Sequence, residues 1–291
     1  MTTLAAWLDS ASERFAAAGI FEGRVDAELL AAHALACSRG QLQADAVVGR
    51  ELDAAELTEM NALAERRAAR EPLQHLTGIA PFRQLELRVG PGVFVPRPET
   101  EQVVQFAIDT MRAVPHARPR AVDLGTGSGA IALAIASEVP TSEVWAVELS
   151  PEARSWSAVN IERYGQGRVR LVAGDLTDAS IVAADGSSLD GTFDVVISNP
   201  PYIPDAAIPR DPEVARFDPA LALYGGDDGL DLVRALSHTA LRLARPGGTL
   251  VIEHGELQAS AVADILRADG WQAIASHRDL TGRDRATTAL R

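Results

Sequence analysis

A short apolar strand that ends in two prolines constrains the fold of this chain more than any other stretch. The segment Asp194–Ser198 has a continuous β-branched core, which is typical of a central strand of a parallel sheet. The next residues, Asn199–Tyr202, include two prolines that lack backbone donors and fix φ, so a strand ladder cannot continue. Open α/β sheets bind ligands in loops at the carboxyl ends of their strands. We therefore expect a binding site at this point.

Strand and helix patterns alternate on both sides of this segment. Before it, we expect strands at 121–124, 143–148 and 169–173 and helices at 130–136 and 151–164. After it, we expect a loop at 203–229, helices at 230–244 and 257–268, and strands at 249–253, 273–277 and 286–290. Alternation of this kind predicts an α/β fold with a parallel sheet and crossover helices.

The chain before residue 120 predicts two further parts. Apolar residues recur at helical spacing around 4–15, 27–37 and 53–67, with Asp26 and Asp53 as candidate helix caps, so residues 1–71 predict a helical domain. Glycines, prolines and short alternating runs in 72–95 predict a β-hairpin linker. The remaining domain, 96–291, begins with a helix that Glu99 or Thr100 could cap.

Composition excludes several functions. The net charge of −13 argues against a protein whose main partner is a phosphate backbone. The 27 basic residues are all arginines, so a lysine Schiff base, a Walker A lysine and a kinase lysine are excluded. The single cysteine, Cys37, excludes an intrachain disulfide and a thiolate metal cluster. No apolar run approaches a membrane span and no basic start precedes one, so we expect a cytoplasmic protein without a membrane partner.

The ends of three successive strands describe a pocket for an adenosyl group. A glycine-rich loop opens the helix after the first strand, where backbone N–H groups can approach a ligand closely. Glu148 ends the second strand and could accept from ribose hydroxyls, and Asp175 ends the third and could accept from an adenine amino group. The predicted cofactor-binding residues are Asp123, Gly125, Thr126, Gly127, Ser128, Gly129, Glu148, Asp175, Leu176 and Asn199.

Two cofactors fit this pattern. A nicotinamide dinucleotide fits because Gly125, Gly127 and Ala130 match a loose G-x-G-x-x-A sequence. S-adenosylmethionine is favoured by Asp123, an acid placed where the cationic methionine end could lie, and by Asn199–Tyr202 at the end of the fourth strand, opposite the expected methyl group.

The Asn-Pro-Pro-Tyr segment suits a planar NH₂ group. The following proline holds Asn199 extended, and its carboxamide offers one acceptor and one donor group in fixed geometry. The carbonyls of Pro200 and Pro201 are further acceptors, and Tyr202 adds a flat aromatic face. The alternative is a proline-rich strand exit in which Tyr202 only packs.

Together, Asp123–Gly129 and Asn199–Tyr202 resemble the class I methyltransferases that modify planar nitrogens. Four further segments narrow the resemblance to the bacterial release factor glutamine methyltransferases of the HemK type. These segments are Pro91-Gly92, Phe94–Glu101, Gly225–Asp231 and Ile252–Gly255. The resemblance runs from about Glu71 to the C-terminus, and the helical N-terminal part also matches in size.

The resemblance implies a Rossmann-like catalytic domain with a seven-stranded sheet and a helical N-terminal domain that helps hold a release factor. It implies methyl transfer from S-adenosyl-L-methionine to the side-chain amide nitrogen of the Gln in the Gly-Gly-Gln motif of release factors one and two, leaving S-adenosyl-L-homocysteine, without a metal. The residues expected to be catalytic are Asn199, Pro200 and Tyr202, and those expected to bind substrate are Asn199, Pro200, Pro201, Tyr202, Phe94 and Arg97. One departure is Leu176, where relatives often carry an aromatic residue beside the adenine.

Three other functions stay open at this point. A DNA adenine-N6 methyltransferase can use the same tetrapeptide on a flipped base, although the net charge of −13 and the absence of a basic target-reading region weigh against it. A dinucleotide oxidoreductase would leave Asn199–Tyr202 without a role. A non-catalytic adaptor would use only its N-terminal helices. We expect a monomer that makes no direct contact with nucleic acid.

Overall fold

The computed structural model describes residues 2–291, and the chain divides into two compact units. The first runs to Ile79 and also contains Arg210–Phe217, and the second comprises Ala80–Pro209 and Asp218–Arg291. The discontinuous piece at 210–217 was not expected from the sequence. The boundaries predicted at 1–71, 72–95 and 96–291 stay predictions.

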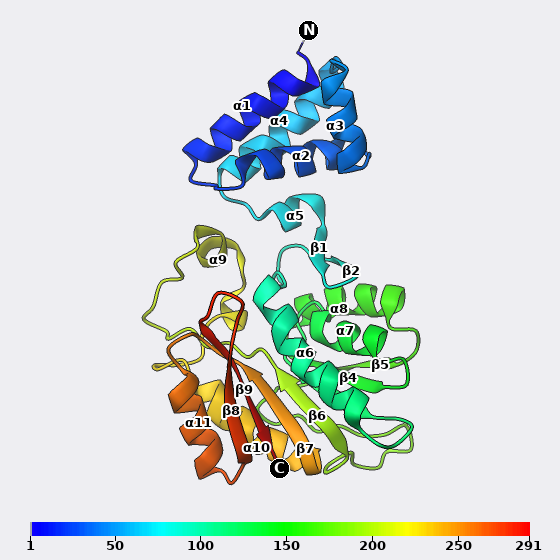
Figure 1. The fold of residues 1–291 in the computed structure, drawn as a ribbon, viewed down its shortest axis with the longest axis vertical. Coiled ribbons are helices and arrows are strands. Elements are labelled where there is room, and N and C mark those ends of the chain that lie inside the picture. Colours follow the sequence, from blue (N-terminus) through cyan, green and yellow to red (C-terminus); the bar gives the residue numbers. More distant parts are fainter. Residues whose placement is uncertain (1) are drawn as a thin grey trace. The chain divides into compact units, whose positions relative to one another are not determined.

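Helices build the first unit around one apolar core (Figure 1). They are α1 (Leu4–Ala17), α2 (Gly23–Ala34), α3 (Arg39–Val47), α4 (Ala54–Ala68) and α5 (Leu73–Thr77). Asp53 caps α4 in a capping box with Glu56, as predicted, because each side chain bonds to the other residue's backbone N–H. The prediction that Asp26 caps α2 is wrong. That helix begins three residues earlier at Gly23, and the Asp26 carboxylate bonds to Arg67 Nε at 2.7 Å.

Two arginines, one buried and one half-buried, hold the discontinuous piece of the first unit. Its helix α9 (Pro212–Phe217) carries Glu213, whose carboxylate lies 2.8 Å from Arg67 Nη1 and 2.6 Å from Arg70 Nη2. These two partners help lower the pKa of Glu213 to about 2, although burial opposes the shift. The segment 203–229, expected as a loop, therefore contains α9 and also a 3₁₀ turn, η1 (Ala220–Ala222). An ion pair between residues 146 positions apart has no local sequence pattern that would reveal it.

The second unit contains two sheets. Strands β1 (Ile79–Phe82) and β2 (Leu85–Arg88) form a two-stranded sheet within the predicted hairpin linker. The larger sheet has seven strands in the order β5-β4-β3-β6-β7-β9-β8, which confirms the predicted α/β class. Its strands are β3 (Arg120–Leu124), β4 (Glu143–Glu148), β5 (Val169–Ala173), β6 (Phe193–Ser198), β7 (Ala244–Glu253), β8 (Gln272–Arg278) and β9 (Asp284–Leu290). Strands β3 to β7 run parallel, and β9 is antiparallel to β7 and to β8.

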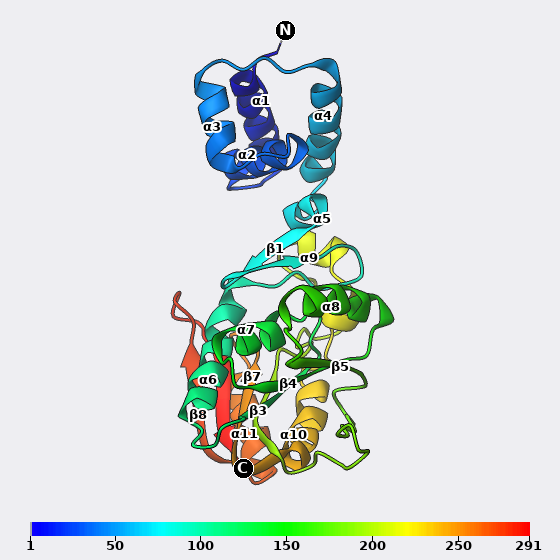
Figure 2. The same cartoon turned by 90° about the vertical axis from the view of Figure 1, so that its right-hand side faces the viewer.

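Helices cover both faces of the larger sheet (Figures 1 and 2). The helices α6 (Pro98–Ala113), α7 (Ala130–Glu138) and α8 (Pro151–Tyr164) pack on one face, and α10 (Asp231–Leu243) and α11 (Ala259–Ala268) pack on the other. Successive residues of β3 and β6 enter opposite cores, since side chains alternate across a strand. Because β3, β4, β5 and β6 are parallel, their carboxyl ends lie along one edge of the sheet.

Candidate active site

The glycine loop after β3 is folded onto the carboxylate of Asp123. Gly125, Gly127 and Gly129 all have positive φ, at 78°, 58° and 86°, which glycine adopts without strain. Asp123 Oδ2 accepts from Thr126 Oγ1 at 2.5 Å and from the Ala132 backbone N–H at 3.2 Å. These bonds join the strand end, the loop and the first turn of α7.

Asp123 itself is fully buried. Burial raises its pKa to about 7, against the hydrogen bonds from Thr126 and Ala132 that favour the charged form. Its Oδ1 has no hydrogen-bond partner among residues 2–291. The structure therefore gives Asp123 a role in holding the loop, and its contact with the methionine end of a cofactor stays a prediction.

Glu148 also braces the glycine loop. It is buried at the end of β4, where Oε2 accepts from the Gly127 N–H and Oε1 from the Ser150 N–H, both at 2.8 Å. The loop is supported from α8 as well, because the Ser128 carbonyl accepts from Asn160 Nδ2 at 2.9 Å. A carboxylate has about four acceptor positions, so Glu148 keeps capacity for ribose hydroxyls.

The end of β5 adjoins the same loop. Asp175 is exposed, and its Oδ1 accepts from both the backbone N–H and the hydroxyl of Thr177 at 2.8 Å. A Cβ added to Gly125 would lie 3.4 Å from Leu176 Cδ2. Leu176 therefore packs beside the glycine loop, and its contact with an adenine stays a prediction.

Asn199 lies at the same edge of the sheet. Ser198 Oγ donates to the Leu124 carbonyl at 2.6 Å, which ties the end of β6 to the end of β3, one residue before the glycine loop. Asn199 Nδ2 donates to Thr100 Oγ1 at 3.4 Å, and Thr100 is buried in the first turn of α6. No residue from 2 to 291 donates a hydrogen bond to the carbonyl of Pro200.

Thr100 and Glu99 do not cap α6, so that prediction is wrong. The helix begins at Pro98, and its cap residue is Arg97, whose side chain makes no capping bond. Proline at the first helical position removes a donor that would otherwise need a cap. The hydroxyl of Thr100 is therefore left for Asn199.

Two glycines support the Asn-Pro-Pro-Tyr segment from behind. A Cβ added to Gly225 would lie 2.5 Å from the Pro201 carbonyl, and one added to Gly229 would collide with the Tyr202 carbonyl. The Tyr202 carbonyl also accepts from Gln258 Nε2 at 3.0 Å. Gly225 and Gly229 belong to a segment that carries the family resemblance, but no role for them follows from the sequence alone. Close approach of two backbones is the reason for glycine at both positions.

Phe94 and Arg97 form a separate pair in the approach to α6. The Arg97 guanidinium lies 4.9 Å from the centre of the Phe94 ring, and its Nη2 donates to Asp218 Oδ2 at 2.6 Å. Both predicted substrate-binding residues are therefore held in place, and the charge of Arg97 acts on Tyr202, whose pKa it lowers against the effect of burial.

Two ionisable groups near Asn199 have strongly shifted pKa values. Burial first, and then the charge of Glu253, raises the pKa of Tyr202 to about 12, so its phenol stays neutral. Glu253 is the last residue of β7, and its burial raises its pKa to about 7. The segment Ile252–Gly255 carries the family resemblance, but no role for Glu253 follows from the sequence alone. A single acid in an apolar strand does not indicate which residues lie beside it in the folded sheet.

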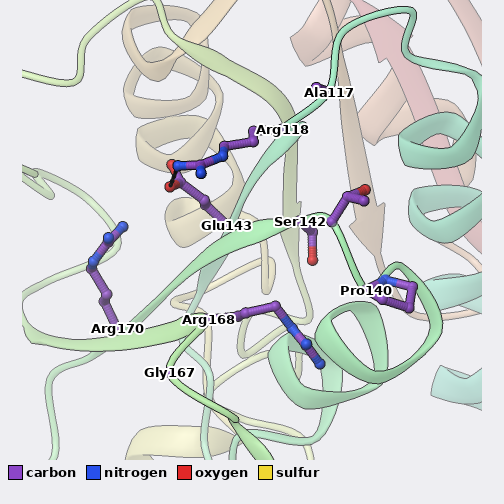
Figure 3. Close-up of a pocket in the computed structure, with 9 residues that line it drawn as sticks. Ala117, Arg118, Pro140, Ser142, Glu143, Gly167, Arg168 and Arg170 are labelled. Carbon is purple, nitrogen blue, oxygen red and sulfur yellow. Dashed lines mark ion pairs between the residues drawn. The ribbon is translucent and has the colours of Figure 1, made fainter.

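A cavity of about 300 Å³ lies at the amino ends of β3, β4 and β5, opposite the carboxyl ends that carry the predicted site (Figure 3). Its lining residues precede or begin β3, β4 and β5, and they are Ala117, Arg118, Pro140, Thr141, Ser142, Glu143, Gly167, Arg168 and Arg170. Its arginines already have partners: Arg118 pairs with Glu143 at 3.9 Å, Arg168 donates to the Ala136 carbonyl, and Arg170 stacks on Trp145. The cavity contains none of the predicted site residues.

No cluster of His, Cys, Asp or Glu in the described part of the chain could hold a metal ion. Among the helices of residues 2–291, none is long and apolar enough to cross a membrane.

Comparisons with known proteins cover both units. Residues 6–78 match the family described as the PrmC N-terminal domain, and residues 84–211 match the methyltransferase small domain. A crystal structure of a methyltransferase from Pyrococcus furiosus is similar in fold, with a TM-score of 0.50 and 22% identity over 72% of this chain and 89% of that chain.

Two relatives match along almost their whole length. The release factor glutamine methyltransferase of Streptomyces coelicolor is 49% identical over 99% of this chain and 98% of the relative. The protein of the same name from Bifidobacterium longum is 44% identical over 97% of this chain and 98% of the relative. The chain belongs to the release factor glutamine methyltransferase family.

Proposed function

We propose that this protein transfers the methyl group of S-adenosyl-L-methionine to the side-chain amide nitrogen of the Gln in the Gly-Gly-Gln motif of bacterial release factors, and so acts in translation termination. The observation that carries the proposal is the bond from Ser198 to Leu124, which sets Asn199 beside the glycine loop. The substrate in this proposal, a release factor glutamine, is inferred from the names of the relatives in the family.

The cofactor half of the site comprises Asp123–Gly129, Glu148, Asp175 and Leu176. When bound, the cofactor supplies an electrophilic methyl group on a sulfonium. The N–H groups at the start of α7 would face the cofactor, Glu148 would accept from its ribose, and Asp175 and Leu176 would flank its adenine. S-adenosyl-L-homocysteine leaves as product, and no metal takes part.

The substrate half comprises Asn199–Tyr202 together with Thr100 and Glu253. An amide nitrogen is a poor nucleophile because its lone pair is delocalised into the carbonyl. Asn199 Oδ1 and the Pro200 carbonyl accept its two N–H bonds and turn the lone pair toward the methyl. Such alignment can contribute up to about 7–11 kcal/mol. The same oxygens stabilise the positive charge that develops on nitrogen, and its proton leaves after transfer.

Aromatic residues complete the substrate half in this proposal. The neutral phenol of Tyr202 packs on the glutamine amide and excludes water. Phe94, held by Arg97, closes the same side. The helical first unit binds the body of release factor one or two, and the enzyme works as a cytoplasmic monomer without nucleic acid.

A DNA adenine-N6 methyltransferase is the rival that shares this chemistry. It is not favoured, because the chain carries a net charge of −13 and its near full-length relatives are named for release factors.

Mass spectrometry provides the direct test. Purified enzyme and S-adenosyl-L-methionine should add one methyl group to the Gln of the Gly-Gly-Gln motif of release factors one and two. A release factor with Gly-Gly-Ala instead should gain none, and plasmid DNA should stay unmodified in the same assay. Methyl transfer to DNA adenine, or to another release factor residue, would contradict the proposal.

A further inference from the structure

Glu253 stands directly beside Asn199 in the sheet, although the mechanism above does not use it. Ser198 of β6 pairs with Ile252 of the parallel strand β7, so the next residue on each strand is Asn199 and Glu253. On its other side Glu253 pairs with Ala286 of β9. Only 2% of Glu253 is exposed, and its Oε2 has no hydrogen-bond partner among residues 2–291. A buried carboxyl oxygen without a hydrogen-bond partner costs free energy, which makes Glu253 a candidate functional group.

Several groups determine whether Glu253 is charged. Burial raises its pKa to about 7, and the charge of Glu99 in α6 acts in the same direction. Side-chain hydrogen bonding by Thr100 and Asn199 and the charge of Arg285 in β9 favour the ionised form.

Two further neighbours of Glu253 have ionisable side chains. The phenol of Tyr202 stays neutral. The adjacent imidazole of His254 faces elsewhere, toward Thr287 Oγ1 and the Gly255 carbonyl, and burial lowers its pKa.

The direction of each hydrogen bond follows from these contacts. An ionised carboxylate can only accept, so the hydroxyl of Thr100 and the NH₂ group of Asn199, both hydrogen-bonding neighbours of Glu253, must each donate to it. The lone pairs of that hydroxyl then face Asn199, which must present its Nδ2 donor to them, as the 3.4 Å contact shows. Asn199 Oδ1 consequently points away from Thr100 and Glu253. A protonated Glu253 can donate, and the hydroxyl of Thr100 is then free to donate to Asn199 Oδ1 instead.

We propose that Glu253 is a positioning residue, whose carboxylate acts directly and through Thr100 to keep Asn199 Oδ1 facing the substrate nitrogen. The proposal rests on the proposed function in one respect, because the outward oxygen matters for catalysis only if it accepts from an amide N–H. The orientation of the Asn199 side chain itself does not depend on any substrate.

The kinetic test uses Glu253→Gln, which keeps the size of the side chain but can both donate and accept. We expect kcat at saturating cofactor to fall roughly 10- to 100-fold, as for a misplaced catalytic group, with the Kd of S-adenosyl-L-methionine unchanged. In the unmodified enzyme, kcat should also fall as the pH drops below about 7. That acid limb should be absent in Glu253→Gln. Titration of Asp123 instead acts on cofactor affinity, so measuring kcat and cofactor Kd separately distinguishes the two acids.

Variants of Thr100 show whether the loss of kcat in Glu253→Gln comes from the hydrogen bonds or only from impaired folding. Thr100→Val removes the hydroxyl at nearly constant volume and should lower kcat, but by less than Glu253→Gln does, because Asn199 keeps its direct contact with Glu253. Thr100→Ser retains a hydroxyl and should recover most of that loss. The double variant Glu253→Gln/Thr100→Val should be no slower than Glu253→Gln, because the hydroxyl acts only through Glu253.

The orientation of Asn199 can be followed without substrate. The side-chain NH₂ signal of Asn199 in a ¹⁵N NMR spectrum, assigned by its loss in Asn199→Ala, should shift with a midpoint near pH 7. In Glu253→Gln it should not titrate. A static signal in the unmodified protein, or full kcat with an intact acid limb in Glu253→Gln, would overturn the positioning role. A titrating signal in an enzyme that does not methylate release factors would instead leave the positioning role standing and overturn the function.

Discussion

The cofactor half and the substrate half of the site each contain one buried carboxyl group with a pKa raised to about 7, yet they use it differently. Asp123 accepts two hydrogen bonds from its own loop, at 2.5 and 3.2 Å, so its surroundings are fixed within ten residues of chain. Glu253 has as its hydrogen-bonding neighbours Thr100 and Asn199, which come from distant segments. The hydrogen bonds of Asp123 are therefore set by local sequence, whereas those of Glu253 are assembled by the tertiary fold.

Among the substitutions that compare the two halves of the site, Asn199→Ala is expected to change kcat the most. The substitution removes the oxygen proposed to accept from the glutamine amide and touches none of the loop bonds around Asp123. We expect kcat to fall by about 1,000-fold while the Kd of S-adenosyl-L-methionine changes less than threefold. Steady-state kinetics and calorimetric titration measure the two quantities. Parallel loss of affinity and turnover would mean that Asn199 serves the cofactor half instead.

A second test uses two glycines of similar φ. Gly229 (φ 76°) supports the Tyr202 carbonyl, whereas a Cβ on Gly167 (φ 73°) would meet nothing within 4 Å. Gly167→Ala should lower the free energy of unfolding by about 1–2 kcal/mol through φ alone. Gly229→Ala should add a steric term, for a total of about 3 kcal/mol, and should also reduce kcat. Chemical denaturation compares the two, and equal losses would show that Gly229 does not brace the substrate half.

The pH dependence of stability tests the charge of Glu253. Its folded pKa, about 7, lies above the ordinary value of 4.5, so the folded state binds more protons and stability falls as pH rises through that window. Glu253→Gln avoids the ionisation and should be more stable than the unmodified protein at pH 8, by roughly 3 kcal/mol. The difference should shrink below about 1 kcal/mol near pH 5. Thermal unfolding at both pH values measures it, and a variant that is less stable at pH 8 would refute the buried charge.

The smallest effect is expected in the cofactor half, at Leu176. Replacement by Phe supplies a ring that can stack on the adenine, and the cofactor Kd should fall by about 2- to 10-fold. The kcat at saturating cofactor should stay unchanged, because the substrate half is untouched. Calorimetric titration measures the cofactor Kd of both proteins. A higher Kd in the variant would mean that the adenine does not lie beside Leu176.

The parts of the structure that short-range pattern determines could be predicted from the sequence. The strand containing Val195, the glycine loop after Leu124 and the capped start of α4 at Asp53 all follow from periodicity and local chemistry. The helix α3 was missed because only Leu42 of its nine residues is buried, which leaves almost no apolar period to detect. The helix α9 was missed because six residues are too few for one.

The site shows the same division. The residues of the glycine loop carry a recognisable spacing, so their shared location was predictable. Thr100 and Glu253 were not identified as neighbours of Asn199, because the first lies 99 positions away along the chain and the second belongs to a strand whose register only the folded sheet fixes. Thr100 was instead expected to cap its helix, a role that Pro98 makes unnecessary.

The pairing of Glu213 with Arg67 and Arg70 bears on how such proteins can be recombined. A chimera whose first 79 residues come from a relative that lacks either arginine would leave the carboxylate of Glu213 without that partner, unless residues 210–217 are exchanged as well. An orphaned charge at that depth is strongly destabilising. Exchange of the whole unit between homologues therefore requires three crossovers, after residues 79, 209 and 217, because the inherited unit is a pair of chain pieces that no single breakpoint can transfer.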